Sequence, residues 1–146
     1  MPKLPPQSSL QYHSSYPCSA AELYTWHSRP GALERLLPPW DNTRVLEKSG
    51  GIEPGGQVLL KMHLGPFPCH YQGRHLETVP GVMFRDVQEK GPFASWSHRH
   101  FFADTLKGAE LTDVVDYALP GHRFLPRWLR QSVERQLHRM FCHREK

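Results

Sequence analysis

Short clusters of Gly and Pro divide residues 43–119 into six stretches with the composition of β-strands. The clusters read SGGIEPGG, GPFP, PG, KGP and KGAE, and each is a turn signal. Strands joined by such short connections pair antiparallel, because a parallel crossover needs about a dozen residues or more. The sequence therefore predicts an antiparallel sheet with strands at residues 43–48, 57–64, 69–79, 82–88, 94–103 and 111–119.

The pattern changes after residue 119, where apolar residues begin to recur at helical spacing. From Pro126 onward, one apolar stripe faces away from a polar face. The stripe holds Leu129, Val133, Leu137, Met140 and Phe141, and the polar face holds Arg127, Gln131, Glu134, Arg135 and His138. This pattern predicts an amphipathic helix of about five turns. Its stripe must pack on the sheet, which is the only large apolar partner that the sequence predicts.

The first forty residues predict one strand and two short helices. Residues 1–7 are Pro-rich and are expected to be disordered, whereas residues 10–16 alternate weakly, as an edge strand does. Ser19 and Glu22 have the spacing of a capping box, which predicts a helix that ends before Pro30. A second short helix, ALERLL, stops at two prolines.

The expected order is a strand, two short helices, six strands and a long helix, which is an α+β architecture. The chain has 146 residues and no linker, so residues 8–146 are expected to form a single domain. An antiparallel sheet of this size curls around a single long helix and leaves a space between them. Concave, mostly apolar spaces of this kind bind small molecules.

Charge is concentrated at the C-terminal end. Residues 121–146 hold seven Lys or Arg and two acidic residues, whereas the other 120 residues hold eleven and twelve. The simplest interpretation of this basic segment is a solvent-exposed helix face, although a basic helix can attract nucleic acid or anionic lipid. No aromatic platform is interleaved with the basic residues, so specific nucleic-acid binding is not expected.

The number of cysteines and the hydropathy of the chain indicate the cellular compartment in which the protein is expected. Cys18, Cys69 and Cys142 are an odd number without a close pair, which disfavours disulfides and a Cys-based zinc site and suits a reducing cytoplasm. A nucleophilic role for Cys69 is not expected, since no partner for it is evident. No apolar run approaches the roughly 18 residues of a membrane span. The first residues also lack the pattern of a secretory signal.

Three stretches resemble a known family. TWHSRPGALERLLPPW, VMFRDVQEKGPFASWSHRHFF and LTDVVDYALPG are similar to the bacterial ligand-binding branch of the SRPBCC superfamily, which has the START-like, birch-pollen-allergen-like helix-grip fold. The motif WHxRPGAxxRLxPPW is long and specific, and the resemblance spans roughly residues 10–144. It implies a curved antiparallel sheet around a C-terminal helix and a hydrophobic-ligand pocket.

The resemblance implies no particular reaction, because the superfamily includes lipid carriers, polyketide cyclases and hormone receptors. The same branch also occurs fused to nucleotide-sugar-epimerase-like proteins. An epimerase-like protein is therefore an implied partner.

Strand alternation places several aromatic and titratable residues on one face of the sheet. In residues 94–103 the even positions carry the bulky side chains, and we assign them to the concave face. The resulting expected pocket residues are Tyr71, His75, Phe84, Asp86, Trp96, His98, His100, Asp113 and Tyr117. Within this set, His75, Asp86, His98, His100 and Asp113 form a candidate His/Asp cluster.

Three hypotheses compete for the cluster. It can tether neighbouring strands, since an unpaired buried charge is costly. It can hold the polar end of an apolar ligand. It can also be a metal or acid–base centre, for which His98, His100 and Asp86 are the only weak catalytic candidates. We expect hydrogen bonds between imidazoles and carboxylates, with no bound metal and no cofactor, because strand spacing suits such bonds as well as it suits metal ligation.

A second set of residues lies around the two short helices. Trp26, His27, Arg35 and Trp40 either pack over the open end of the sheet or border a pocket mouth, where His27 or Arg35 would meet an anionic head group. The sequence thus predicts binding of a small, largely hydrophobic molecule with a polar end by a monomer or weak dimer. A cyclase- or hydratase-like enzyme and an accessory module that docks on an epimerase-like protein are the alternatives.

Overall fold

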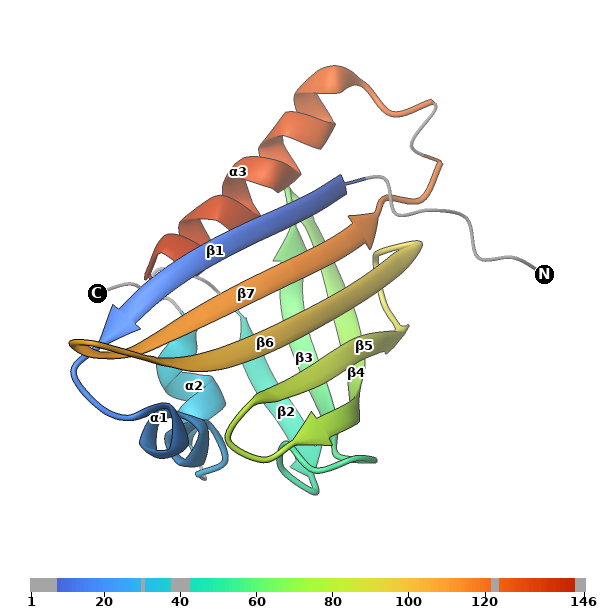
Figure 1. Ribbon diagram of the computed structural model, residues 1–146. Coiled ribbons are helices and arrows are strands. Elements are labelled where there is room, and N and C mark those ends of the chain that lie inside the picture. Colours follow the sequence, from blue (N-terminus) through green and yellow to red (C-terminus); the bar gives the residue numbers. More distant parts are fainter. Residues whose placement is uncertain (1–7, 30, 38–42, 122–123, 144–146) are drawn as a thin grey trace.

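The computed structural model describes residues 8–29, 31–37, 43–121 and 124–143. These residues form a seven-stranded antiparallel sheet in the order β1-β7-β6-β5-β4-β3-β2 (Figure 1). The strands are β1 (Ser8–Tyr16), β2 (Arg44–Ser49), β3 (Gln57–Leu64), β4 (Phe67–Val79), β5 (Met83–Lys90), β6 (Ser95–Thr105) and β7 (Gly108–Ala118). The predicted antiparallel sheet is confirmed, while the Pro-rich lead and Trp40 lie outside the described residues.

Three helices accompany the sheet: α1 (Ala20–His27), α2 (Ala32–Leu36) and α3 (Arg127–His143). The Ser19 side chain accepts a hydrogen bond from the Glu22 amide at 3.1 Å, so the predicted N-cap of α1 is present. Gly31 precedes α2 with φ of 85°, a left-handed conformation that favours glycine. Figure 1 shows α1 and α2 together at one end of the sheet, while α3 crosses it. None of the helices within the described ranges is long and apolar enough to cross a membrane.

Two hairpins are tighter than the sequence predicts. Leu64 pairs with Phe67, and Thr105 pairs with Gly108, so each connection contains only two residues. The expected starts at residues 69 and 111 were therefore wrong by two and three residues. The reason is that GPFP and KGAE contain strand residues as well as the turn itself, with Gly65 at φ of 59° in the first.

The stripe of α3 packs toward the sheet as predicted. Val133, Leu137 and Phe141 are buried, and Phe141 stacks on Tyr12 with ring centroids 4.9 Å apart. The predicted polar face, which carries Arg127, Gln131, Glu134, Arg135 and His138, is exposed. The fold is therefore the helix-grip arrangement, in which one face of the sheet covers a long amphipathic helix.

A polar layer divides the interior into two apolar clusters. The cluster near α1 includes Ala20, Leu23, Tyr24, Ile52, Phe84, Phe102, Ala109 and Leu111. The cluster near α3 includes Phe93, Val115, Tyr117, Leu119, Val133, Leu137 and Phe141. On β7, buried Asp113 lies between Leu111 and Val115, one from each cluster. The functional site is built around this layer.

Candidate ligand-binding site

A cavity of about 520 Å³ lies between the sheet and α3. Its size is within the range of ligand pockets, which is about 300–1,000 Å³. The walls come from the segment of α1 and α2, from β2 to β6 and from α3, and most of them are apolar. The cavity thus occupies the space that curling of the sheet around the helix was expected to leave.

Strand alternation brings the polar residues of the cavity together. His98 and His100 lie two residues apart on β6, so both point to the same face. Across the sheet, Asp86 of β5 pairs with His98, and Asp113 of β7 pairs with His100. The two imidazole rings lie 3.7 Å apart between their centroids.

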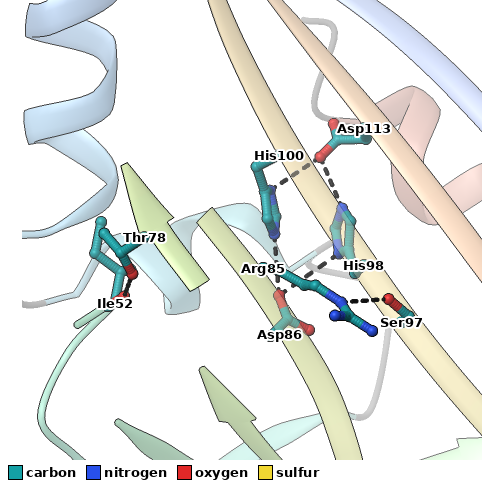
Figure 2. Close-up of polar contacts among 8 residues, drawn as sticks. All are labelled: Ile52, Thr78, Arg85, Asp86, Ser97, His98, His100 and Asp113. Atoms are coloured by element: carbon teal, nitrogen blue, oxygen red, sulfur yellow. Dashed lines mark hydrogen bonds and ion pairs between the residues drawn. The ribbon is translucent and has the colours of Figure 1, made fainter. Parts of the chain in front are cut away.

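The four side chains form a closed ring of contacts, which Figure 2 shows. His98 Nε2 donates to Asp113 Oδ1 at 2.8 Å, and His100 Nε2 donates to Asp86 Oδ2 at 3.0 Å. His100 Nδ1 lies 3.0 Å from Asp113 Oδ1 without the alignment of a hydrogen bond. His98 Nδ1 faces Asp86 Oδ2 across 3.9 Å. Both carboxylates therefore touch both histidines.

The charges of this ring follow from burial and mutual contact. Burial lowers the pKa of His98, and the neighbouring His100 lowers it further. Burial also acts against the charged form of His100, but contacts with Asp113 and Asp86 outweigh it and raise that pKa. Burial disfavours ionised Asp86, yet the two histidines lower its pKa to about 2, and they lower that of Asp113 as well. Contacts with the two carboxylates thus favour the protonated form of His100, whereas burial favours the neutral form of His98.

Two further polar groups of the cavity wall have unused hydrogen-bonding capacity. The Tyr71 hydroxyl and His75 Nδ1 are buried and have no hydrogen-bond partner among the described residues. Burial and the nearby Asp86 charge raise the pKa of Tyr71 well above 10.0, so its hydroxyl stays protonated. Unpaired buried polar atoms are costly, and a ligand or water can relieve that cost.

The structure divides the expected site residues into three groups. Those that line the cavity are His27, Tyr71, His75, Phe84, Asp86, Trp96, His98 and His100. Two others lie behind the wall: Asp113 contacts the two histidines, and Tyr117 packs on Phe93 and Trp96. Trp26 and Arg35 line a second hollow of about 860 Å³ beside α1 instead. His27 borders both spaces, with Nδ1 donating to the Leu23 carbonyl at 2.8 Å.

Several wall residues were not among the predicted pocket residues. They include Ile52, Leu60, Met62, Phe93, Gln136 and Met140, of which Met140 was predicted only as part of the helix stripe. Leu60 pairs with Tyr71 in the sheet, so strand register was a usable signal for it. The sequence held no such signal for Gln136, because its role depends on contacts with the β3–β4 hairpin. Its side chain accepts from the Gly65 amide at 2.9 Å and donates to the His63 carbonyl at 2.6 Å.

One set of side chains in the cavity has the composition of a metal site. Asp86, His98 and His100 can each offer one ligand atom, and these atoms lie within 4.8 Å of one another. The three cysteines are free. A cysteine-based site is not formed by the part of the chain that the structure describes.

The curved sheet, the C-terminal helix and the mostly apolar cavity between them define a START-like domain of the helix-grip class. The model of the family described as polyketide cyclase / dehydrase and lipid transport matches residues 16–144. The chain belongs to this family, and the resemblance to the SRPBCC superfamily is confirmed. Among proteins with curated functions, none has significant sequence similarity to this chain.

Solved structures share the fold at low sequence identity. The aromatase/cyclase ZhuI from Streptomyces sp. R1128 is 14% identical, with a TM-score of 0.71 over 94% of this chain and 88% of that one. A START superfamily protein from Mycobacterium smegmatis is 12% identical, with a TM-score of 0.65 over 93% and 91%. Ara h 8.0201 is 16% identical, with a TM-score of 0.62 over 92% of both chains. These similarities establish the fold.

Proposed function

We propose that the protein binds a small, largely hydrophobic molecule with a polar end in the cavity between the sheet and α3. The observation that carries the proposal is a cavity of about 520 Å³ whose mostly apolar wall contains the polar patch of Asp86, His98 and His100. Apolar walls supply affinity without direction, whereas a few fixed polar groups orient the ligand. Family membership supports the same use, since the family description includes lipid transport.

The polar end of the ligand is assigned to the side of the cavity formed by Tyr71, Asp86, His98 and His100. Tyr71 offers a protonated hydroxyl with no partner among the described residues. Asp86 is ionised and offers acceptor oxygens. Of the two residues expected to meet an anionic head group, Arg35 lines the other hollow, whereas His27 borders both spaces. The ionised Asp86 favours, on its own side of the cavity, a head group that donates hydrogen bonds over an anionic one.

Binding can be measured with N-phenyl-1-naphthylamine, a neutral fluorescent probe with one N–H donor. We expect saturable binding of one molecule per chain. Leu60→Trp adds bulk to the cavity wall and should abolish binding, whereas Val82→Trp alters an exposed position, 51% accessible, that does not line the cavity. Equal binding by both variants would contradict the proposal.

A cyclase- or hydratase-like activity is the second candidate, because His100 and Asp86 form an acid–base pair at the cavity wall. A poly-β-carbonyl thioester is the matching probe. Product formed by the wild type and lost in Asp86→Asn would favour an enzyme over a binding protein. Unchanged substrate would favour binding alone.

Docking on an epimerase-like protein is a third use, with the chain itself a monomer or weak dimer. The exposed Trp128, 63% accessible, favours a partner on the outer side of α3. Co-elution with an epimerase-like protein, lost in Trp128→Ser, would support it. Separate elution at micromolar concentrations would count against it.

A further inference from the structure

Two hydrogen-bond acceptors face each other inside the polar layer. Because His98 uses its Nε2–H on Asp113, the neutral tautomer of this ring places a lone pair on Nδ1. This nitrogen faces Asp86 Oδ2 across 3.9 Å (Figure 2). A lone pair opposite a carboxylate is unfavourable unless a proton or a cation lies between them.

Asp113 orients both imidazole rings from behind. Its Oδ1 lies 2.8 Å from His98 Nε2 and 3.0 Å from His100 Nδ1, and its side chain is only 3% exposed. The remaining nitrogens, His98 Nδ1 and His100 Nε2, both turn toward Asp86. A carboxylate that accepts from the far nitrogen of a metal-binding histidine is the usual outer partner of such sites. Here Asp113 accepts from His98 and lies close to the far nitrogen of His100.

We propose that Asp86, His98 and His100 bind a divalent first-row transition cation at the cavity wall, with Asp113 as the positioning residue. Zinc and ferrous iron are the cations that two imidazoles and one carboxylate suit. Their bonds to nitrogen and oxygen are about 2.0–2.2 Å, which places neighbouring ligand atoms about 3–3.5 Å apart. The contacts of 3.0 and 3.9 Å around Asp86 Oδ2 bracket that spacing.

Charge balance points the same way. His100 lies 3.0 Å from Asp86 through Nε2 and 3.0 Å from Asp113 through Nδ1. Two carboxylates thus lie in a buried layer, where uncompensated negative charge is costly. A divalent cation held by Asp86, His98 and His100 balances the charge of both carboxylates.

The expectation of hydrogen bonds without a bound metal rested on the spacing of the strands. That spacing does not show which nitrogen of the His98 and His100 rings faces Asp113. The three ligands come from two adjacent strands and face the cavity, so further coordination positions are open toward it. An oxygen at the polar end of a cavity ligand could occupy one of them. Metal binding itself needs no organic ligand, so this inference can fail while the proposed function stands.

The test is titration of chelator-treated protein with Zn²⁺ by calorimetry and with Co²⁺ by visible absorption. We expect one equivalent of metal per chain, with Co²⁺ bands of a site with nitrogen and oxygen ligands. Asp86→Asn should weaken binding about 100-fold or more, and Asp113→Asn about 10–100-fold. Asp86 is partly accessible at the cavity wall, so its variant should fold even if Asp113→Asn does not.

Two surface pairs provide matched controls. Cys142 lies 3.5 Å from His138 on α3, and His13 lies 2.8 Å from Glu110, so either pair could hold a metal adventitiously. Cys142→Ser and His13→Gln should leave the affinity unchanged. Absence of stoichiometric binding would overturn the inference. So would loss of binding in either control, or unchanged binding in Asp86→Asn.

Discussion

His98 Nε2 lies 2.8 Å from Asp113 Oδ1, and both side chains are more than nine-tenths buried. This contact joins β6 to β7 between two apolar clusters. It fixes the orientation of the His98 ring without using the nitrogen that faces Asp86. The same bond thus serves the stability of the layer and the arrangement of the cavity wall.

Asp113→Asn should destabilise the protein by about 3 kcal/mol, because it removes the charge that two buried histidines share. Urea unfolding of metal-free protein measures this loss. Asp116→Asn is the matched control, since Asp116 is partly exposed and pairs with the exposed Arg99 side chain at 3.3 Å. Its effect should stay within about 1 kcal/mol. Equal losses of unfolding free energy in the two variants would show that Asp113 contributes no more to stability than the partly exposed Asp116.

Leu137→Asp should prevent stable folding, whereas Arg135→Ala should be nearly silent. Leu137 is 4% exposed within the cluster that joins α3 to the sheet, and an unpaired buried carboxylate there costs several kcal/mol. Arg135 lies on the exposed face, where substitutions usually change stability by about 0.5 kcal/mol or less. Thermal unfolding compares the two variants. Similar midpoints would contradict the assignment of the faces.

Gln136→Ala should loosen the junction between α3 and the β3–β4 hairpin. The substitution leaves the Gly65 amide and the His63 carbonyl without their side-chain partner, a loss of about 1–3 kcal/mol. Hydrogen exchange at the Gly65 amide should accelerate with it. Gln131→Ala, on the exposed face of α3, should change neither quantity. Unchanged exchange at Gly65 in Gln136→Ala would show that the contact contributes little.

Gly73→Ala should weaken probe binding while the fold is kept. A Cβ at this position would lie 2.8 Å from Tyr71 Cε1, so the Tyr71 ring must shift. Both residues line the cavity, and a displaced ring changes its shape. Arg74→Ala, at the neighbouring exposed position, should bind the naphthylamine probe like the wild type. Equal affinities for both variants would contradict a role for the Tyr71 ring in binding.

Alternation along β5, β6 and β7 was enough to predict that Asp86, His98, His100 and Asp113 meet. The pairs β5–β6 and β6–β7 are in simple antiparallel register, so residue parity determined the face. His75 was predicted to join them, and it lines the cavity. The register between β4 and β5 shifts just beyond it, however, and no hydrogen bond to the ring of four is present. Bulges of this kind leave no clear pattern in a single sequence.

The residues around α1 were harder to place. His27 lies one helical turn after Leu23, which is buried, and so faces inward with it. Trp26 lies about 100° away around the helix and faces the second hollow. The helix α1 has only eight residues, and its faces differ little in hydrophobicity. Its sequence therefore does not determine which face turns toward the sheet. Contacts with β6 and β7 decide it, and sequence spacing does not reveal those contacts.

The methionine methyl groups give the most direct test of the cavity as the binding site. Met62 and Met140 line it from opposite sides, on β3 and α3, whereas Met83 on β5 does not. The test is to label the methyl groups with ¹³C and add N-phenyl-1-naphthylamine. The Met62 and Met140 signals should shift together and saturate at one equivalent, with Met83 unchanged. Shifts confined to Met83, or equal shifts at all three, would contradict binding between the sheet and α3.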